Sequence, residues 1–118
     1  KYPEYEQEVK VPEKVWPLRI WYMYDQDVCT LIDVNERERK VKIKNYTDKI
    51  MFRAFGVMEE PDYNQYIEFL ESRCFPESRD KMKLILKDLG LPFYDPIMII
   101  EKTEGRMAED DFWIRIER

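Results

Sequence analysis

A chain of 118 residues, 44% of them hydrophobic and 14% aromatic, can bury one hydrophobic core but not two. Its 25 acidic residues outnumber its 20 basic ones, and the resulting net charge of −5 opposes binding to a phosphate backbone, so we do not expect a nucleic-acid partner. The sequence has no histidine, which excludes histidine general bases, His-containing catalytic triads and the usual zinc ligand sets.

The apolar segments and the two cysteines predict the compartment. The longest apolar run, Ile97 to Ile100, is far too short to span a bilayer, and no signal-peptide pattern opens the chain. Cys29 and Cys74 lie in apolar segments and form no CxxC pair, which is typical of small buried thiols. We expect a cytoplasmic protein without membrane association, cofactor or metal.

The first half of the chain predicts an antiparallel β-meander. Residues 1–17 are charged and punctuated by proline, so we treat them as an extended lead-in and 18–118 as one domain. Three segments rich in β-branched and aromatic residues follow, at Leu18–Tyr24, Val28–Val34 and Lys40–Tyr46. The connectors between them are short and polar, which favours hairpins over parallel crossovers.

The third of these segments alternates regularly between apolar and basic residues. Val41 and Ile43 fall on one side of the predicted strand, and Lys40, Lys42 and Lys44 fall on the other. This pattern is typical of a sheet that buries one face and exposes the other.

The second half of the chain predicts helices. Apolar residues repeat with helical spacing over residues 63–75 and again over 78–89, where Gly90 follows as a stop signal. Asp95 followed by Pro96 is typical of a helix start, so we prefer a third short helix to a strand here.

The order of elements predicts an α+β fold: an antiparallel β-meander of three to four strands, two to three helices packed on one face, and a final C-terminal strand over residues 111–116. The fourth meander strand is left open, because Ile50–Phe55 suits either a short strand or a packed turn. We expect Trp113 to share one core with the apolar faces of the first two helices, which are Tyr66–Ile67–Leu70 and Met82–Ile85–Leu86–Leu89.

An acidic motif follows the first predicted strand. Asp25-Gln26-Asp27-Val28 resembles the nucleophile motif of haloacid-dehalogenase-type phosphatases, whose aspartates lie where a parallel strand leads into a loop and helix. Here another strand follows at once, so we favour a hairpin turn. The enzyme alternatives are a His-free ribonuclease and a metal-dependent enzyme built on Asp25, Asp27, Asp110 and Asp111.

The helix break at Pro76 offers a binding site. Arg73 and Arg79 flank this break, from which both guanidinium groups can reach the acidic loop before the last strand. In one interpretation they lock the loop by charge-assisted hydrogen bonds; in the other, at least one stays exposed for a partner carboxylate or phosphate. The candidate binding residues are Arg73, Arg79, Asp111 and Trp113.

One local basic stripe is the sequence basis for an RNA- or DNA-binding face, and a solvated strand face explains it equally well. It consists of Arg37, Arg39, Lys40, Lys42 and Lys44, with Tyr46 close by.

The segment from Tyr66 to Ile116 carries a resemblance. Its FLESRCFPESRDKMKLILKDLGL run and the later DDFWIRI are similar to uncharacterised small proteins of Firmicutes and their mobile elements, and to segments ahead of HipA-like kinase domains, although the kinase part is absent. The resemblance implies a bacterial, mobile-element or toxin–antitoxin-like setting. With three Trp, eight Tyr and six Phe available, we expect a non-enzymatic accessory or inhibitor that binds a protein partner, in an oligomeric state left open.

Overall fold

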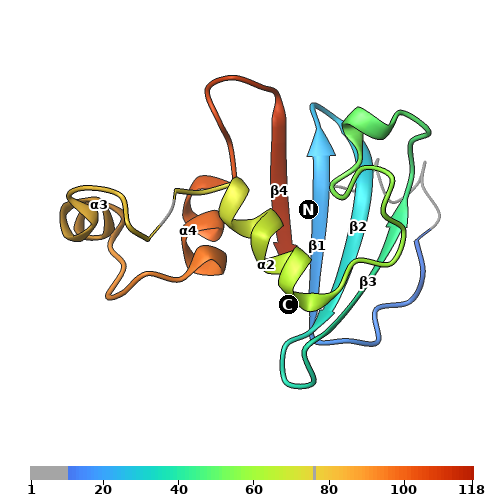
Figure 1. Cartoon of the computed structure of the whole chain (residues 1–118), viewed down its shortest axis with the longest axis horizontal. Helices are drawn as coiled ribbons and strands as arrows, with labels where there is room; N and C mark the ends of the chain where they lie inside the picture. The colour runs from blue at the N-terminus through green and yellow to red at the C-terminus, as the bar shows by residue number, and fades with distance from the viewer. Residues whose placement is uncertain (1–10, 76) are drawn as a thin grey trace.

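A four-stranded antiparallel sheet in the order β3-β2-β1-β4 lies at the centre of the computed structural model, which describes residues 11–75 and 77–118 (Figure 1). The strands are β1 (Leu18–Tyr24), β2 (Asp27–Asn35), β3 (Lys40–Asn45) and β4 (Phe112–Glu117). All three pairings are antiparallel. The predicted α+β class and the antiparallel meander with a final C-terminal strand are therefore confirmed.

The connections of the meander are tight, as their polar residues predicted. Asp25 takes a left-handed φ of 53° in the turn between β1 and β2, and Arg39 does so between β2 and β3, with φ 56°. Local side-chain hydrogen bonding lets aspartate adopt this conformation. Ile50–Phe52 forms a short 3-10 helix, η1, so the open question about a fourth meander strand is resolved as a turn.

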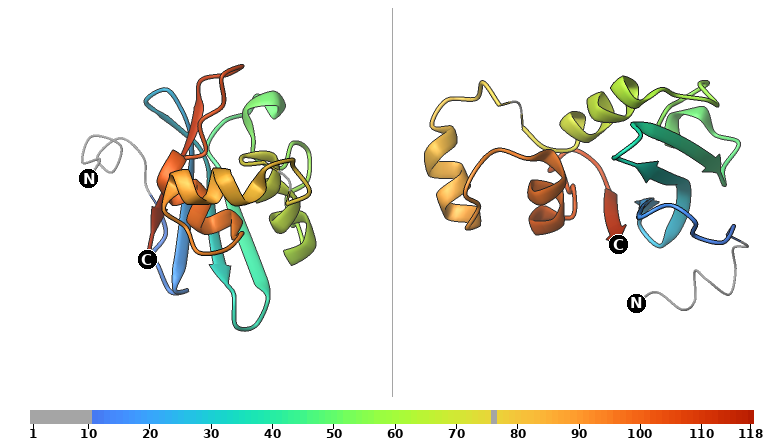
Figure 2. Two further views of the ribbon diagram at one scale, coloured as in Figure 1. Left: turned by 90° about the vertical axis from the view of Figure 1, so that its left-hand side faces the viewer. Right: turned by 90° about the horizontal axis from the view of Figure 1, so that it is seen from below.

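Two helices cover one face of the sheet (Figure 2). The first, α2 (Tyr63–Ser72), begins at a capping box formed by Asp62 and Gln65. The second, α4 (Pro96–Thr103), begins at Asp95, whose side chain accepts a hydrogen bond from the Ile97 amide. The region left open between helix and strand is thus a helix.

This first core joins the helices to the sheet. Sheet residues such as Ile20, Ile32 and Ile114 pack with Tyr66 and Leu70 of α2. From α4 the core receives Ile97 and Ile100. The predicted burial of the Tyr66–Leu70 face is therefore confirmed.

The opposite face of the sheet carries a second core, which the prediction of a single buried face missed. It consists of Trp21, Met23, Val28, Leu31 and Trp113, with Val11 and Tyr46 packed against it. The near-continuous apolar run of β1 is the reason, because a strand buried on both faces has no polar side. The prediction that Trp113 joins the helix core is wrong. Of the predicted lead-in, residues 1–10 lie outside the described part, and 11–17 form neither helix nor strand.

The remaining helix, α3 (Met82–Leu89), lies apart from the sheet, on the far side of α4 (Figures 1 and 2). It begins later than predicted because Lys81 takes a left-handed φ of 62°. Leu86 is buried locally but belongs to neither core, so the predicted place of α3 in the core is wrong. None of the described helices is long and apolar enough to cross a membrane.

Candidate functional site

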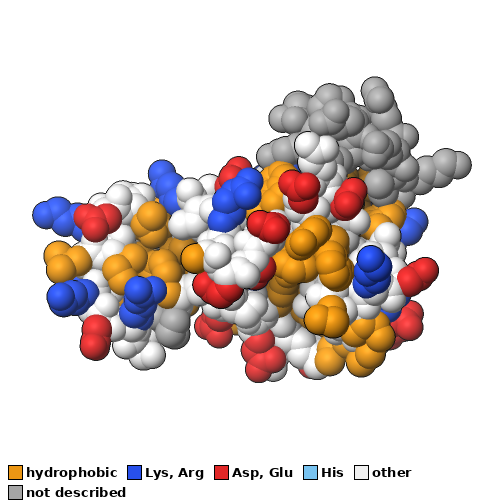
Figure 3. Space-filling model, turned by 90° about the horizontal axis from the view of Figure 1, so that it is seen from above, with side chains coloured by type: hydrophobic (Ala, Val, Ile, Leu, Met, Phe, Trp, Pro, Cys, Tyr) orange, Lys and Arg blue, Asp and Glu red, His pale blue; other side chains and the backbone are white. Residues whose placement is uncertain are grey.

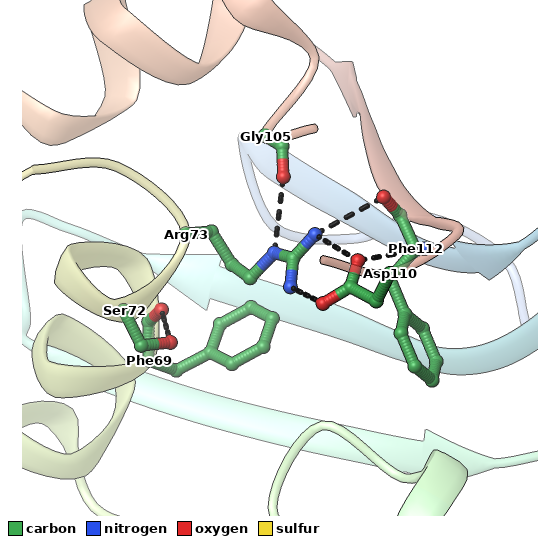
Figure 4. A network of polar contacts seen from close by, with 6 residues as sticks. All are labelled: Phe69, Ser72, Arg73, Gly105, Asp110 and Phe112. Carbon is green, nitrogen blue, oxygen red and sulfur yellow. Dashed lines mark hydrogen bonds and ion pairs between the residues drawn. The ribbon is translucent and has the colours of Figure 1, made fainter. Parts of the chain in front are cut away.

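Arg73, the residue that ends α2, forms the centre of a polar network at the predicted junction (Figure 4). Its Nε donates to the Gly105 carbonyl at 3.0 Å, and its Nη1 and Nη2 donate to the two carboxylate oxygens of Asp110 at 3.0 and 3.2 Å. Nη2 also donates to the Phe112 carbonyl at 3.0 Å. The guanidinium group thereby ties the end of α2 to the segment between α4 and β4.

The electrostatics of this network favour the charged form of Asp110. Hydrogen bonding from Arg73 lowers the pKa of Asp110, against an opposing effect of burial, and the Phe112 amide, which donates to the same carboxylate, lowers it further. Arg73 is 6% exposed. Its polar atoms are occupied, so the structure uses this arginine to hold the fold rather than to meet a ligand.

The acidic partner of Arg73 is Asp110, not the neighbouring Asp111 that the sequence analysis selected. Asp111 is exposed, and its carbonyl accepts a hydrogen bond from the Asp25 amide at 3.2 Å. Of the two adjacent acids, Asp110 is the one whose carboxylate is turned to the Arg73 guanidinium group. The choice between them depends on register, which neighbouring sequence does not reveal.

Arg79 lies on the other side of the break and remains exposed. Its guanidinium carbon is 5.6 Å from the centre of the Phe75 ring, and it forms no ion pair with the described residues. Arg73 and Arg79 line one pocket of about 240 Å³. Its other lining residues are Cys74, Phe75, Ile99, Thr103, Arg106, Met107 and Ala108.

Asp111 and Trp113 line a second pocket, of about 280 Å³, which shares Arg106 and Met107 with the first. Trp113 is 5% exposed, and its indole Nε1 donates to the Asp25 carbonyl at 2.7 Å. The guanidinium carbon of Arg106 is 5.1 Å from the centre of the Trp113 ring. The four predicted site residues thus divide between two adjoining pockets.

The aspartates of the enzyme alternatives gather only in part. Asp25, Asp110 and Asp111 line the second pocket, whereas Asp27 does not. Asp25 lies in a hairpin turn and Asp27 begins the antiparallel strand after it, so neither stands at the end of a parallel strand, as the hairpin interpretation predicted. Within residues 11–75 and 77–118, no three His, Cys, Asp or Glu side chains form a group that could hold a metal ion.

The two thiols lie in apolar surroundings. Burial raises the pKa of Cys29 to about 11, and it also raises the pKa of Cys74, which is half-buried beside the Tyr94 hydroxyl. Both side chains are therefore protonated thiols at neutral pH rather than thiolate nucleophiles.

The surface of α3 is the feature that the sequence analysis missed. Leu84 and Phe93 are 58% and 57% exposed. Beside them, an open groove of about 580 Å³ is lined by Lys83, Leu86, Lys87, Gly90, Leu91 and Pro92. We call these eight residues the α3 surface. Figure 3 shows hydrophobic side chains gathered between basic ones over this end of the molecule.

Signals for this surface were present in the sequence. Leu84 lies off the stripe formed by Met82, Ile85 and Leu86, and a leucine outside the inward stripe of an amphipathic helix indicates a second apolar face.

Comparison of the chain with protein-family models, curated proteins and solved structures found no match.

Proposed function

We propose that this protein is a non-enzymatic interaction module, an accessory or inhibitor that binds a protein partner through the α3 surface. The observation that carries the proposal is the position of α3 outside both cores, with Leu84 and Phe93 exposed to more than half of their area. Large apolar side chains grouped within a polar rim are typical of protein-binding sites.

The charges around the groove indicate the kind of partner. Lys83 and Lys87 lie one helical turn apart on its rim, and neither forms an ion pair with the described residues. The chain as a whole has a net charge of −5, so these two lysines form a locally basic patch on an acidic protein. A partner that presents an apolar side chain beside carboxylates satisfies both features.

A second group of exposed apolar residues is the rival candidate for the protein-binding surface. Met51 is 90% exposed and Val57 is 74% exposed, both in the segment that follows β3. Two basic residues, Lys49 and Arg53, stand beside this set in the sequence, against three at α3, which are Lys81, Lys83 and Lys87, and acidic Glu59 and Glu60 follow it. We therefore favour the α3 surface, and we use Met51 as the rival position.

The resemblance to small proteins of Firmicutes and their mobile elements supports the same proposal. It suggests a bacterial, toxin–antitoxin-like setting in which a small acidic cytoplasmic domain restrains or assists another protein.

Site-specific photo-crosslinking in the native host tests the proposal. Benzoylphenylalanine is placed at Leu84, at Phe93, at Met51 and, as a polar control, at exposed Glu68 on α2. We expect one protein to crosslink to positions 84 and 93 and not to the other two, and Leu84→Asp to abolish its co-purification without lowering the melting temperature. Crosslinking from position 51 alone, or equally from all four positions, would contradict the proposal.

A further inference from the structure

The two edges of the sheet differ in how their backbone groups are used. At the β4 edge, the Phe112 amide donates to the Asp110 carboxylate at 3.0 Å, and the Phe112 carbonyl accepts from Arg73. The Ile114 amide donates to the Glu104 carbonyl at 2.7 Å. Side chains and the end of α4 therefore close much of this edge against a further strand.

At the β3 edge, by contrast, the outward-pointing backbone groups are not used in this way. Along β3, successive residues point their backbone amides and carbonyls alternately toward β2 and away from it. The Tyr46 amide donates to the Cys29 carbonyl, and Asn45 pairs with Thr30. The backbone amides and carbonyls of Val41, Ile43 and Asn45 therefore point away from β2. In the part of the chain that the structure describes, these backbone groups form no further hydrogen bond.

Lysine side chains line one face of this edge. Lys40, Lys42 and Lys44 are exposed, and they alternate with Val41 and Ile43 along the strand. The Lys42 ammonium is 4.7 Å from the centre of the Trp16 ring, and that of Lys44 is 5.3 Å from the centre of the Tyr46 ring. Among the described residues, Lys40 alone of the three has a carboxylate partner, Glu38, at 3.5 Å on the surface.

We propose that the β3 edge binds an extended acidic peptide segment of a partner protein by strand addition. The open amides and carbonyls supply the backbone hydrogen bonds, and carboxylates at every second residue of the added strand lie opposite the lysines. A second copy of β3 fits poorly, because its lysines would face these lysines across the new pair. This edge is separate from the α3 surface and does not depend on it.

The test uses a fluorescent nonapeptide of alternating glutamate and valine as the probe, with anisotropy as the readout. We expect saturable binding that weakens at high salt and shifts the backbone amide resonances of Val41, Ile43 and Asn45. The combined variant Lys42→Glu, Lys44→Glu should bind about tenfold more weakly. The matched control, Lys83→Glu with Lys87→Glu on α3, should bind as the wild type does.

Two altered probes separate strand addition from simple charge attraction. A peptide methylated on alternate backbone nitrogens, on the side that faces β3, should lose binding because it cannot donate to the open carbonyls. A lysine–valine peptide should not bind. Binding that survives methylation, or that the α3 variant abolishes instead, would overturn the proposal. Displacement of the peptide by a tighter-binding single-stranded oligouridylate would overturn it too, and would assign the lysine stripe to RNA.

Discussion

Arg73 and Asp110 form a two-pronged ion pair, with N–O distances of 3.0 and 3.2 Å, that holds the end of α2 against the segment leading into β4. The same guanidinium group also reaches the carbonyls of Gly105 and Phe112. Two segments that lie more than 30 residues apart in the sequence, the end of α2 and the stretch between α4 and β4, are thus joined by one side chain, which makes the junction a structural lock.

Replacing Arg73 with alanine should lower the free energy of unfolding by about 3 kcal/mol, because it leaves the Asp110 carboxylate and two carbonyls without their partner. Arg73→Lys should recover little of this loss, since an ammonium group cannot form the planar fork. Arg79→Ala should change stability by less than about 0.5 kcal/mol, because Arg79 is exposed. Urea denaturation measures all three, and equal losses for Arg73→Ala and Arg79→Ala would refute the lock.

The lowered pKa of Asp110 predicts a pH dependence. Since the folded-state pKa lies below that of the unfolded chain, the pair contributes its full stability above about pH 4 and loses it as the pH falls through the folded-state pKa. Asp110→Asn should therefore be less stable than the wild type at pH 6, and the gap should narrow below pH 4. The check is urea unfolding across this range, and a gap that stays constant with pH would contradict the expectation.

Local sequence patterns predicted most elements because those elements are specified locally. The hairpin turn depends on a residue that tolerates the left-handed φ of Asp25, and the helix start on the hydrogen bond that the Asp95 side chain accepts from the Ile97 amide two residues on. The predictions that failed were those that assigned the faces of strands and helices to a particular core. The alternation around Trp113 predicts two sides of a strand, but it does not say that both sides are buried. The helical stripe of α3 likewise predicts an inward face without naming what it packs against.

The candidate site shows the same division. Proximity in the chain predicted that Arg73 and Arg79 lie near one another, and both do line one pocket. The choice of Asp110 over Asp111 as the partner of Arg73 depends on the register of β4 against β1, across more than 80 residues of chain. A long-range pairing of this kind leaves no trace in the local spacing of residues.

The separation of α3 from the cores predicts unequal costs for two similar truncations. Leu70→Ala opens a cavity in the helix-covered core and should cost about 2–5 kcal/mol. Leu86→Ala should cost less than about 1 kcal/mol, because α3 can relax or open locally without disturbing either core. Denaturant unfolding compares the two variants, and hydrogen exchange should show faster opening of α3 amides than of β1 amides. Equal losses would mean that α3 belongs to the cooperative core.

The last prediction concerns a buried ion pair on the face of the sheet that carries the second core. Arg19 and Asp33 are directly opposite one another in β1 and β2, with Nε–Oδ1 and Nη2–Oδ2 distances of 2.7 and 3.1 Å. Their side chains are 4% and 5% exposed. Removing one partner leaves an uncompensated charge in this setting, so Asp33→Leu should cost about 3–5 kcal/mol.

Removing both charges should reverse that loss. The double variant Arg19→Met, Asp33→Leu replaces the pair with apolar side chains beside the second core, and it should be as stable as the wild type or more stable by about 1–4 kcal/mol. The coupling between the two sites, measured by urea denaturation of both single variants and the double variant, then reports the pair directly. If the double variant instead loses as much free energy of unfolding as the two single variants together, the two side chains act independently. The cost of each single change would then not come from breaking a buried pair.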